Sequence, residues 1–534
     1  MNDSILDRNV AGDKLQESPI SFASQLLSEF SRSQLIGFLT AGWLAYIVLR
    51  SYFSKTLPPS PRRLPVLGNL HQAPLRDHWA AYKTWHKQHG PIISLRFGQR
   101  TIISLGSHQV ANELLNKRSQ NYSSRPNFVV GGALSNNQNS ALIPYGEQWK
   151  IHHSMLTKVM NARMAAKYQF LQNIESKQAM KDLLSVQGKE WIQVFHRYTT
   201  SVTYTLAYGE RLKDLYDERI HFVDELTEII SSNVEKPTNL IADCFPILDN
   251  LPAWLAPWKR LAKMYHGKSM DFFLGEHTKA EQRKSWNWVK ELAESDEAKL
   301  LDKTEVVYLI GVLIEAGGST MKTFEFFVMA AILFPEAVHR AQEELDRVVG
   351  SGRLPDWDDQ ARLPYLNAFI REVQRWRPIF PLGVPHSNQK EEIYDNYRIP
   401  KDSVVIANHW VMDSDHDVFK DADDFRPERW IEDANLPFLA FGYGKRVCPG
   451  QHIAKRSLYI VISRVLWGFN ISHAQKNGKR IELDPNDLVQ NILSGPKPYK
   501  AAFKVRSAKH RHIIENEFGN IGEDERQVWE VCKP

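Results

Sequence analysis

Apolar residues follow a helical period through most of the chain, and this pattern predicts a mainly α-helical protein with small β-sheets. From about residue 75 to 385, apolar positions recur at spacings of three and four, as in helices that bury one face. Two stretches, 92–106 and 397–410, instead contain the short apolar runs of β-strands, and the turn-like FGQR within the first predicts a hairpin. Because no repeat or linker divides this part, we expect one large α-rich domain.

The longest predicted helix covers residues 304–335. It is apolar on almost every side, so we expect it to cross the interior. Asp302 and Glu305 have the spacing of an N-terminal capping pair, and Pro335 is expected to end the helix. The sequence GGST at 317–320 lies in its middle, where each glycine costs about 1 kcal/mol relative to alanine. Such a break in the local rules indicates either a functional site or a close contact between helices.

A stretch without charges precedes the helical part and predicts a membrane anchor. Residues 33–49 read SQLIGFLTAGWLAYIVL and span roughly 25 Å as a helix, against the ~30 Å apolar core of a bilayer. Snorkelling of Arg50 extends the anchor to 33–53. More cations follow this segment than precede it, which places the C-terminal bulk in the cytosol. A buried core helix is the alternative, and a signal peptide is disfavoured because bulky residues and arginine follow.

Prolines mark the next boundary along the chain. Three of them within four residues stiffen a hinge that we place at 54–70. The body of the protein then runs from 71 to 504, and the polar, charged residues 505–534 are expected to form a surface appendage. The segment 1–32, before the anchor, is expected to be lumenal.

The composition narrows the possible functions. Hydrophobic residues make up 43% and charged residues 24% of the 534 residues, as in ordinary globular proteins. The net charge of +5 is small for this length and no long basic run occurs, so nucleic acid is not an expected partner. The three cysteines, Cys244, Cys448 and Cys532, allow no disulfide framework and no zinc-type cluster, which favours a reducing compartment.

A second notable helix is predicted over 364–378, with a proline at each end. Glu372 and Arg375 are three residues apart and therefore share one face of this helix. Taken alone, such a pair is most often exposed and contributes only a few tenths of a kcal/mol.

One cysteine lies in an unusual setting, FGYGKRVCPG at 441–450. The apolar spacing that follows predicts a helix beginning at Pro449, so the Cys448 sulfur lies at a helix N-terminus. The helix dipole and the cations Lys445 and Arg446 favour a thiolate there and predict a lowered thiol pKa. The glycines let the backbone turn sharply and approach a large, flat partner. The alternative is an inert buried cysteine.

This stretch resembles the haem-binding signature of the cytochrome P-450 family, F-x-x-G-x-R-x-C-x-G. The matching residues are Phe441, Gly444, Arg446, Cys448 and Gly450. Three more motifs occur in the family's order: AGGST at 316–320 resembles the oxygen-binding groove of the distal helix, EVQR at 372–375 the ExxR pair, and FRPERW at 425–430 the PERF element. The resemblance covers about residues 30–504, and several stretches are similar to fungal members that tailor secondary metabolites.

The resemblance implies haem b (iron protoporphyrin IX) as the cofactor and Cys448 as the axial ligand of its iron. Arg446 is expected to pair with a haem propionate. Trp149 matches the family's W-x-x-x-R motif, whose arginine position is His153 here, and His386 occupies another position that often donates to a propionate. The structural triad behind the haem is matched by Glu372, Arg375 and Arg429.

The distal helix departs from the family pattern. Where the family usually has an acid before the threonine, this chain has Ser319 before Thr320. A hydroxyl relays a proton through water but is no acid at neutral pH. Glu315 lies four residues before Ser319 on the same helical face. We expect these three residues to be catalytic, with Glu315 and Thr320 sharing a proton relay through ordered water.

The family's substrate contacts predict the walls of the binding cavity. They correspond here roughly to 121–145, 200–265, 308–323 and 378–385. Pro381, Leu382 and Val384 are expected to line the wall or mouth. The mixture of small, apolar and amide side chains favours a moderately sized, fairly apolar substrate with a few polar handles. Terpenoid, polyketide and indole-alkaloid skeletons all fit.

The sequence therefore predicts a haem-thiolate monooxygenase, anchored by a single pass in the endoplasmic reticulum membrane and facing the cytosol. Electrons from NADPH are expected through a separate flavoprotein, NADPH–cytochrome reductase, because the chain has no room for a flavin or nicotinamide domain. Two alternatives stay open. One is a haem-thiolate isomerase or dehydratase that needs no reductase, for which Ser319 is the only support. The other is a non-catalytic haem-binding sensor or carrier, against which Thr320 argues.

Overall fold

The computed structural model describes Gly37 and residues 56–74, 78–234 and 237–533. The predicted lumenal segment and, apart from Gly37, the predicted anchor lie outside this range. Within the range, no helix combines the length and the apolar character that crossing a membrane requires. Residues 58–394 and 399–533 belong to one unit, and Gly37, 56–57 and 395–398 belong to a second, in which the backbone N–H of Arg398 donates to the carbonyl of Thr56 (3.0 Å).

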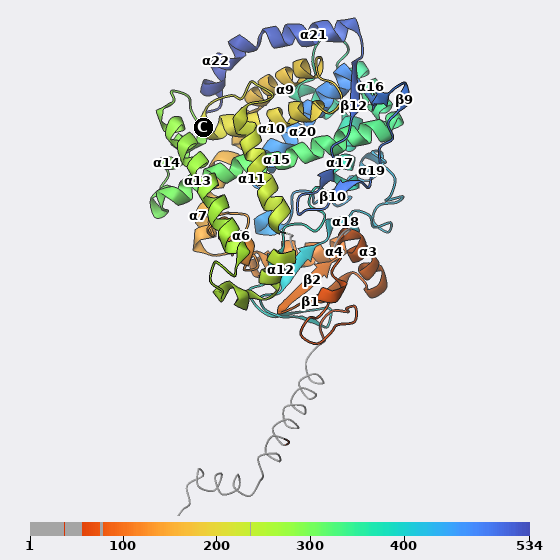
Figure 1. Ribbon diagram of the computed structural model, residues 1–534. Coiled ribbons are helices and arrows are strands. Elements are labelled where there is room, and N and C mark those ends of the chain that lie inside the picture. The colour runs from red at the N-terminus through yellow and green to blue at the C-terminus, as the bar shows by residue number, and fades with distance from the viewer. Residues whose placement is uncertain (1–36, 38–55, 75–77, 235–236, 534) are drawn as a thin grey trace, which may run out of the picture. The chain divides into compact units, whose positions relative to one another are not determined.

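Helices dominate the described residues, as the sequence predicts (Figure 1). From the N-terminal side they are α3 (His78–His89), α4 (His108–Ala111), α5 (Ser119–Tyr122), α6 (Val129–Leu134), α7 (Glu147–Met160), α8 (Ala162–Lys167), α9 (Gln169–Leu183), α10 (Trp191–Tyr208), α11 (Glu218–Val234), α12 (Pro237–Cys244) and α13 (Pro257–Gln282). They continue as α14 (Trp288–Ala293), α15 (Lys303–Leu333), α16 (Pro335–Val348), α17 (Pro364–Trp376), α18 (His409–Met412), α19 (Arg429–Glu432), α20 (Gln451–Gly468), α21 (Ala508–Gly519) and α22 (Ile521–Val531).

Short helical turns and short strands connect these helices. The turns are η1 (Leu70–Gln72), η2 (Asn112–Lys117), η3 (Pro246–Asn250), η4 (Ala298–Leu300), η5 (Trp357–Arg362) and η6 (Gly444–Arg446). The strands are β1 (Ile92–Phe97), β2 (Arg100–Leu105), β3 (His386–Ser387), β4 (Glu392–Tyr394), β5 (Tyr397–Ile399), β6 (Val404–Ala407), β7 (Phe469–His473), β8 (Gln475–Lys476), β9 (Lys479–Arg480), β10 (Leu488–Val489), β11 (Gly495–Pro496) and β12 (Ala501–Val505).

The predicted hairpin over 92–106 is confirmed. β1 and β2 pair antiparallel, with Ile92 opposite Leu105. β2 continues the sheet by pairing parallel to β6, and β6 pairs antiparallel to β3, which gives the order β1-β2-β6-β3. The sheet therefore brings the loop before β3, including residues 379–385, to the same part of the unit as the hairpin.

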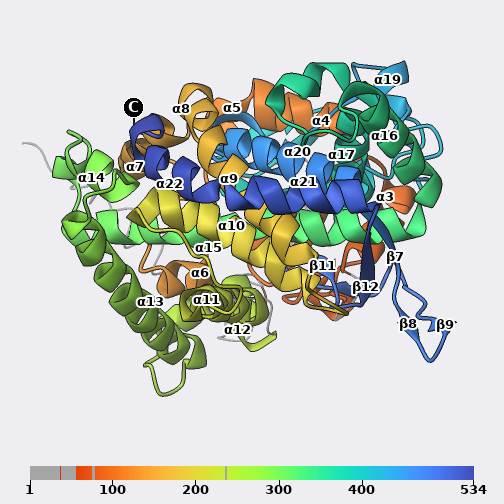
Figure 2. The same ribbon diagram turned by 90° about the horizontal axis from the view of Figure 1, so that it is seen from above.

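The long helix α15 crosses the interior, as predicted, and contacts α10, α11, α13, α17 and α20 (Figures 1 and 2). Its ends differ from the prediction. The side chain of Asp302 makes no capping hydrogen bond. The carboxylate of Glu305 also does not cap the helix: it accepts hydrogen bonds from His152 Nε2 (2.8 Å) and Gln148 Nε2 (2.5 Å) of α7. Pro335 does not merely end α15 but occupies the first turn of α16.

Gly317 and Gly318, the adjacent glycines of α15, have different roles, although the helix is continuous through both. A Cβ atom at Gly317 would lie 2.6 Å from Cγ2 and 2.7 Å from Oγ1 of Thr203 on α10. A Cβ atom at Gly318 would meet no protein atom within 4 Å. The close contact between helices therefore explains Gly317 but not Gly318.

The C-terminal residues, predicted to be a surface appendage, form two helices. α21 and α22 both pack along α9, as Figure 2 shows. Ile514, Val528 and Cys532 are fully buried and join the main hydrophobic core. An ion pair between Lys177 of α9 and Glu517 of α21 (3.0 Å) borders this contact.

Candidate functional site

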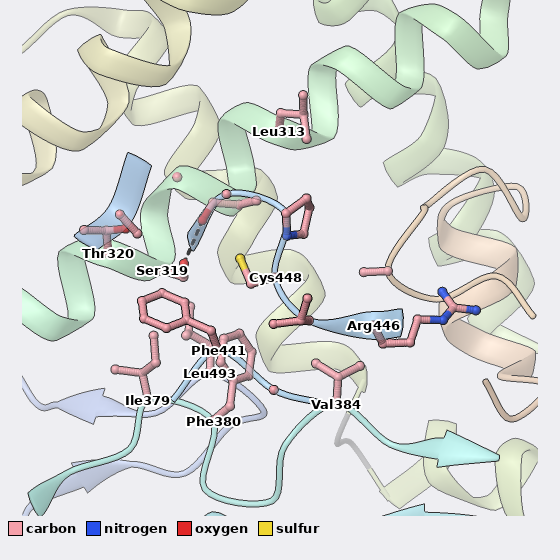
Figure 3. A pocket seen from close by; sticks show the side chains of 18 of the residues that line it. Leu313, Ser319, Thr320, Ile379, Phe380, Val384, Phe441, Arg446, Cys448 and Leu493 are labelled. Carbon is pink, nitrogen blue, oxygen red and sulfur yellow. Dashed lines mark hydrogen bonds between the residues drawn. The ribbon is translucent and has the colours of Figure 1, made fainter. Parts of the chain in front are cut away.

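A cavity of about 510 Å³ lies within the larger unit, bordered by α7, α10, α11, α15 and the loop before α20. Figure 3 shows Ser319 and Thr320 on α15, Cys448 on the loop before α20, and Arg446 away from the two hydroxyls. The apolar part of the wall includes Val202, Ile230, Leu313, Ile379, Phe380 and Leu493. Ser319, Thr320, Arg446 and Cys448 come from segments far apart in the sequence, and all four line the same largely apolar cavity.

Cys448 is held at the N-terminus of α20, and it lines the cavity. Its backbone N–H donates to the carbonyl of Phe441 (2.9 Å), which closes the loop. The helix begins at Gln451, two residues later than predicted, with Gly450 as its N-cap. The N–H groups of these two residues lower the pKa of the Cys448 thiol, but burial has the larger effect and the net pKa is raised. The predicted lowering is therefore wrong for the protein alone, because the loss of hydration outweighs the helix terminus.

Gly444 is required by a contact with η2. Its φ is +53°, and a Cβ atom there would lie 2.4 Å from the backbone oxygen of Leu115 and 2.8 Å from Cβ of Ser119. Its N–H donates to Oδ1 of Asn116 (2.7 Å). The sequence analysis explained this glycine by the approach of a large, flat partner. In the structure, the glycine instead allows the loop to contact another segment of the chain.

Arg446 is anchored by backbone carbonyls. Its Nε and two terminal nitrogens donate to the carbonyls of Ser123 (2.7 Å), Ser140 (3.1 Å) and Ile143 (2.8 Å), and the guanidinium lies 4.5 Å from the ring centroid of Trp149. Among the described residues no carboxylate pairs with it, and burial lowers its pKa to about 9. Of its five N–H donors, three are used, which leaves two for a bound group.

Arg125 is a second buried cation at this end of the cavity. It donates to the carbonyls of Ala141, Val384 and Pro385, each at 2.8 Å, so two of its five N–H donors also remain. Burial and the charge of Arg446 lower its pKa well below the ordinary value. The sequence analysis missed Arg125, because a single arginine in a loop carries no signal until folding places it beside another.

Two predicted histidines also lie here. His153 stacks on Trp149 (4.7 Å between ring centroids, 15° between planes), and burial together with Arg446 lowers its pKa. His386 is fully enclosed and its Nδ1 donates to the carbonyl of Tyr122 (2.8 Å). Burial lowers the pKa of His386 strongly, so the ring is neutral and its Nε2 is an acceptor at neutral pH. His386 Nε2 donates to a bound anion only if the charge of that anion raises the pKa of the ring enough for Nε2 to carry a proton.

The predicted triad forms a buried ionic cluster. Glu372 accepts from Arg375 (2.7 and 2.9 Å), from Arg429 Nε (3.1 Å) and from Trp430 Nε1 (2.9 Å). The other guanidinium nitrogens of the two arginines donate to backbone carbonyls between residues 413 and 424. These three charged side chains do not line the cavity and hold loops in place.

The three distal residues differ in their hydrogen bonding. Ser319 Oγ donates to the carbonyl of Ala316 (2.8 Å), whereas within the described residues Thr320 Oγ1 has no such bond. Glu315 is buried and accepts from Tyr265 Oη of α13 (3.1 and 3.3 Å to its two oxygens). Burial raises the pKa of Glu315 to about 8. All three side chains belong to residues that line the cavity.

The loop before β3 corrects one prediction. Val384 lines the cavity, but Pro381 and Leu382 do not. The N–H of Gly383 donates to the carbonyl of Phe380 (2.9 Å), so Pro381 and Leu382 are the centre of a turn, and Leu382 packs against hydrophobic core residues instead. Ile379 and Phe380 line the cavity in their place.

Comparisons with known proteins agree with this arrangement. The sequence profile of the family described as cytochrome P-450 matches residues 58–503. The chain is 66% identical over 508 residues to the cytochrome P-450 monooxygenase peniB of Penicillium patulum, which covers 95% of this chain and 96% of that protein. It is 42% identical to the cytochrome P-450 monooxygenase FrzL of Cladobotryum sp (87% and 90% covered) and 41% identical to the cytochrome P-450 monooxygenase aneD of Aspergillus aculeatus (88% and 92%). The chain therefore belongs to the cytochrome P-450 family and is a cytochrome P-450 monooxygenase.

Proposed function

We propose that this monooxygenase binds iron protoporphyrin IX through Cys448 and oxidises a moderately sized apolar substrate. The observation that carries the proposal is that one cavity is lined by Cys448, by the buried Arg125 and the half-buried Arg446, and by Thr320, and that neither arginine pairs with a carboxylate of the described residues. The fungal origin of the similar monooxygenases supports an intermediate of fungal secondary metabolism as the substrate.

The residues at the site fit this cofactor. Arg125 and Arg446 each retain two N–H donors toward an anionic group, and two carboxylates are what the haem periphery presents. Their burial without a carboxylate is costly unless an anion compensates it. The ring of Trp149 lies against Arg446, and Phe441 adds apolar surface elsewhere in the same cavity. Cys448 holds the iron, and His153 and His386 serve as further donors to the carboxylates in our proposal.

When bound, the haem supplies the iron that activates dioxygen for transfer of an oxygen atom to the substrate. The chain's own contribution is to deliver protons and exclude bulk water. Thr320 Oγ1 is available to bind a water molecule, whereas the Ser319 proton is engaged by the carbonyl of Ala316, so Ser319 acts as an acceptor. Glu315, whose pKa is about 8, keeps its proton at neutral pH and acts as the acid of the relay.

The relay is tested by the leakage of hydrogen peroxide relative to product. Thr320→Ala and Glu315→Gln are expected to raise leakage, since both interrupt the path of the proton. If both variants remain as well coupled as the wild type, the assignment of the relay is wrong.

We further propose that residues 33–53 anchor the enzyme in the endoplasmic reticulum membrane and that NADPH supplies electrons through a separate flavoprotein reductase. Lys445, Lys455 and Arg456 offer a basic surface near the cysteine loop for an acidic partner. Arg446 is not part of this surface, because its guanidinium donates to backbone carbonyls. The triad of Glu372, Arg375 and Arg429 is assigned a role in folding.

The central experiment is the reduced carbon monoxide difference spectrum of the full chain and of Cys448→His. The wild type is expected to give the band of thiolate-ligated haem, and the variant is expected to lose it. A wild type that binds haem without this band would refute the proposal. Incorporation of labelled dioxygen that depends on a reductase then separates a monooxygenase from a haem-thiolate isomerase or dehydratase, which would show neither.

A further inference from the structure

Glu315 is the single carboxylate among the described residues that line the cavity. The charged groups of the wall otherwise include Arg125, Arg377, Lys445 and Arg446. Glu315 lies between Val312 and Ala316 on the cavity-facing side of α15, and its carboxyl group accepts a hydrogen bond from Tyr265 of α13. Among the described residues, the cavity wall thus has several basic side chains but one acidic side chain.

The hydrogen bonds of the Glu315 carboxyl group do not occupy all of its hydrogen-bonding positions. A protonated carboxyl group offers one O–H donor and acceptor positions on both oxygens, whereas Tyr265 supplies a single proton that the two oxygens share. Among the described residues, no lysine, arginine, histidine or backbone N–H binds it. The nearby Tyr308, whose titration the charge of Glu315 affects, is buried and its Oη makes no hydrogen bond to the described residues.

The surroundings favour an apolar molecule with one polar group. Val202 of α10, Ile230 of α11, and Val312 and Leu313 of α15 line the same cavity. A buried carboxyl without a cation is unfavourable by itself, and burial accordingly raises the pKa of Glu315 to about 8. Such an arrangement is typical of a position that a ligand completes.

We propose that the Glu315–Tyr265 pair is the polar anchor of the substrate site and selects an apolar ring compound that presents an N–H or O–H donor to Glu315. Tyr265 is a positioning residue that holds the carboxyl group toward the cavity, and Glu315 accepts the donor of the ligand. This inference rests on the proposed function, because it assigns the handle by which the oxidised molecule is oriented. It also gives Glu315 a role before any proton is delivered.

Matched probe pairs test the anchor in the haem-loaded full chain. One pair is 2-phenylindole and 1-methyl-2-phenylindole, and the other is 4-phenylphenol and 4-methoxybiphenyl, so in each pair a methyl group replaces the proton of the donor. Equilibrium dialysis measures the affinities. The wild type is expected to prefer the donor of at least one pair by about tenfold, as for one hydrogen bond to a buried carboxyl group. The pair that shows the preference tells an N–H handle from an O–H handle.

Three variants decide the origin of the preference. Glu315→Leu is expected to abolish it while binding of the methylated probes persists, and the double variant Glu315→Leu with Tyr265→Phe repeats the result without leaving Tyr265 unpaired. Tyr265→Phe alone keeps the carboxyl group and is expected to retain most of the preference. Glu325→Gln is the matched control, because Glu325 is a buried acid of the same helix that pairs with Lys322 and does not line the cavity.

Equal binding of the two members of both pairs by the wild type would overturn the inference. So would a preference that survives Glu315→Leu, or one that Tyr265→Phe removes as completely as Glu315→Leu, since the pair would then only connect two helices. The carbon monoxide band of each variant is recorded in parallel. An intact band with no donor preference refutes the anchor alone, whereas a missing band in the wild type refutes the proposed function.

Discussion

The paired glycines of α15 offer a sharp test of the packing described above. Gly317→Ala and Gly318→Ala add the same methyl group one residue apart on one helix. Each gains up to about 1 kcal/mol of helix propensity. Only the first creates a steric conflict, because the new Cβ lies 2.6 and 2.7 Å from the two outer atoms of Thr203.

The magnitude follows from the cost of overpacking, which is about 1–3 kcal/mol in a close-packed interior. Gly317→Ala is therefore expected to lower the free energy of unfolding by up to about 2 kcal/mol, and Gly318→Ala to raise it by about 0.5–1 kcal/mol. The midpoints of urea unfolding of the full chain measure the difference. Thr203→Ala removes both conflicting atoms, so combined with Gly317→Ala it should recover most of the loss, with a coupling of about 1 kcal/mol or more.

A Gly317→Ala protein as stable as Gly318→Ala would refute the reasoning, because the contact with α10 would then not limit the size of residue 317. A double variant whose losses simply add would refute the assignment of the conflict to Thr203.

Three further predictions follow from charged groups. Burial raises the pKa of Glu315 to about 8, so the contribution of this group to the free energy of unfolding is complete below about pH 4.5 and is lost as the pH rises toward 8. Glu315→Gln should therefore gain stability relative to the wild type between pH 5 and pH 8 in urea unfolding. A difference that stays constant over this range would contradict the prediction. Glu372→Ala leaves two buried guanidinium groups without their carboxylate and is expected to cost about 3–5 kcal/mol, seen as loss of soluble protein, whereas exposed Glu336→Ala should have no effect. Arg446→Leu should weaken haem retention in a transfer assay more than Lys445→Leu does, and equal retention would remove Arg446 from the cofactor site.

Much of the fold follows from local patterns in the sequence. The hairpin over 92–106 and the long apolar helix were predictable because each depends on residues close in the chain. Helix ends were less predictable: Pro335 belongs to the first turn of α16, and Glu305 serves α7 instead of capping α15. Both outcomes depend on neighbours that only the folded chain supplies.

The candidate site also contains both residues that a sequence motif locates and residues that only the folded chain brings into place. A signature of fixed spacing locates Cys448, but the direction of its pKa shift depends on burial, which the spacing does not contain. Arg125 and Leu493 line the cavity from loops with no motif of their own. Pro381 and Leu382 were misplaced because a turn at Gly383 reverses which side chains face inward. Tertiary position, more than residue type, decided each of these cases.

The packing of α21 and α22 on α9 has a consequence for the synthesis of the protein. The side chains that cover α9 include Val528 and Cys532, and Lys167 Nζ donates to the backbone carbonyl of Lys533 (2.6 Å). These residues are translated long after α9, so α9 cannot complete its packing until they have emerged from the ribosome. Premature termination within codons 505–534 should therefore yield a chain with every cavity residue present but an apolar helix face uncovered, which cellular quality control would recognise.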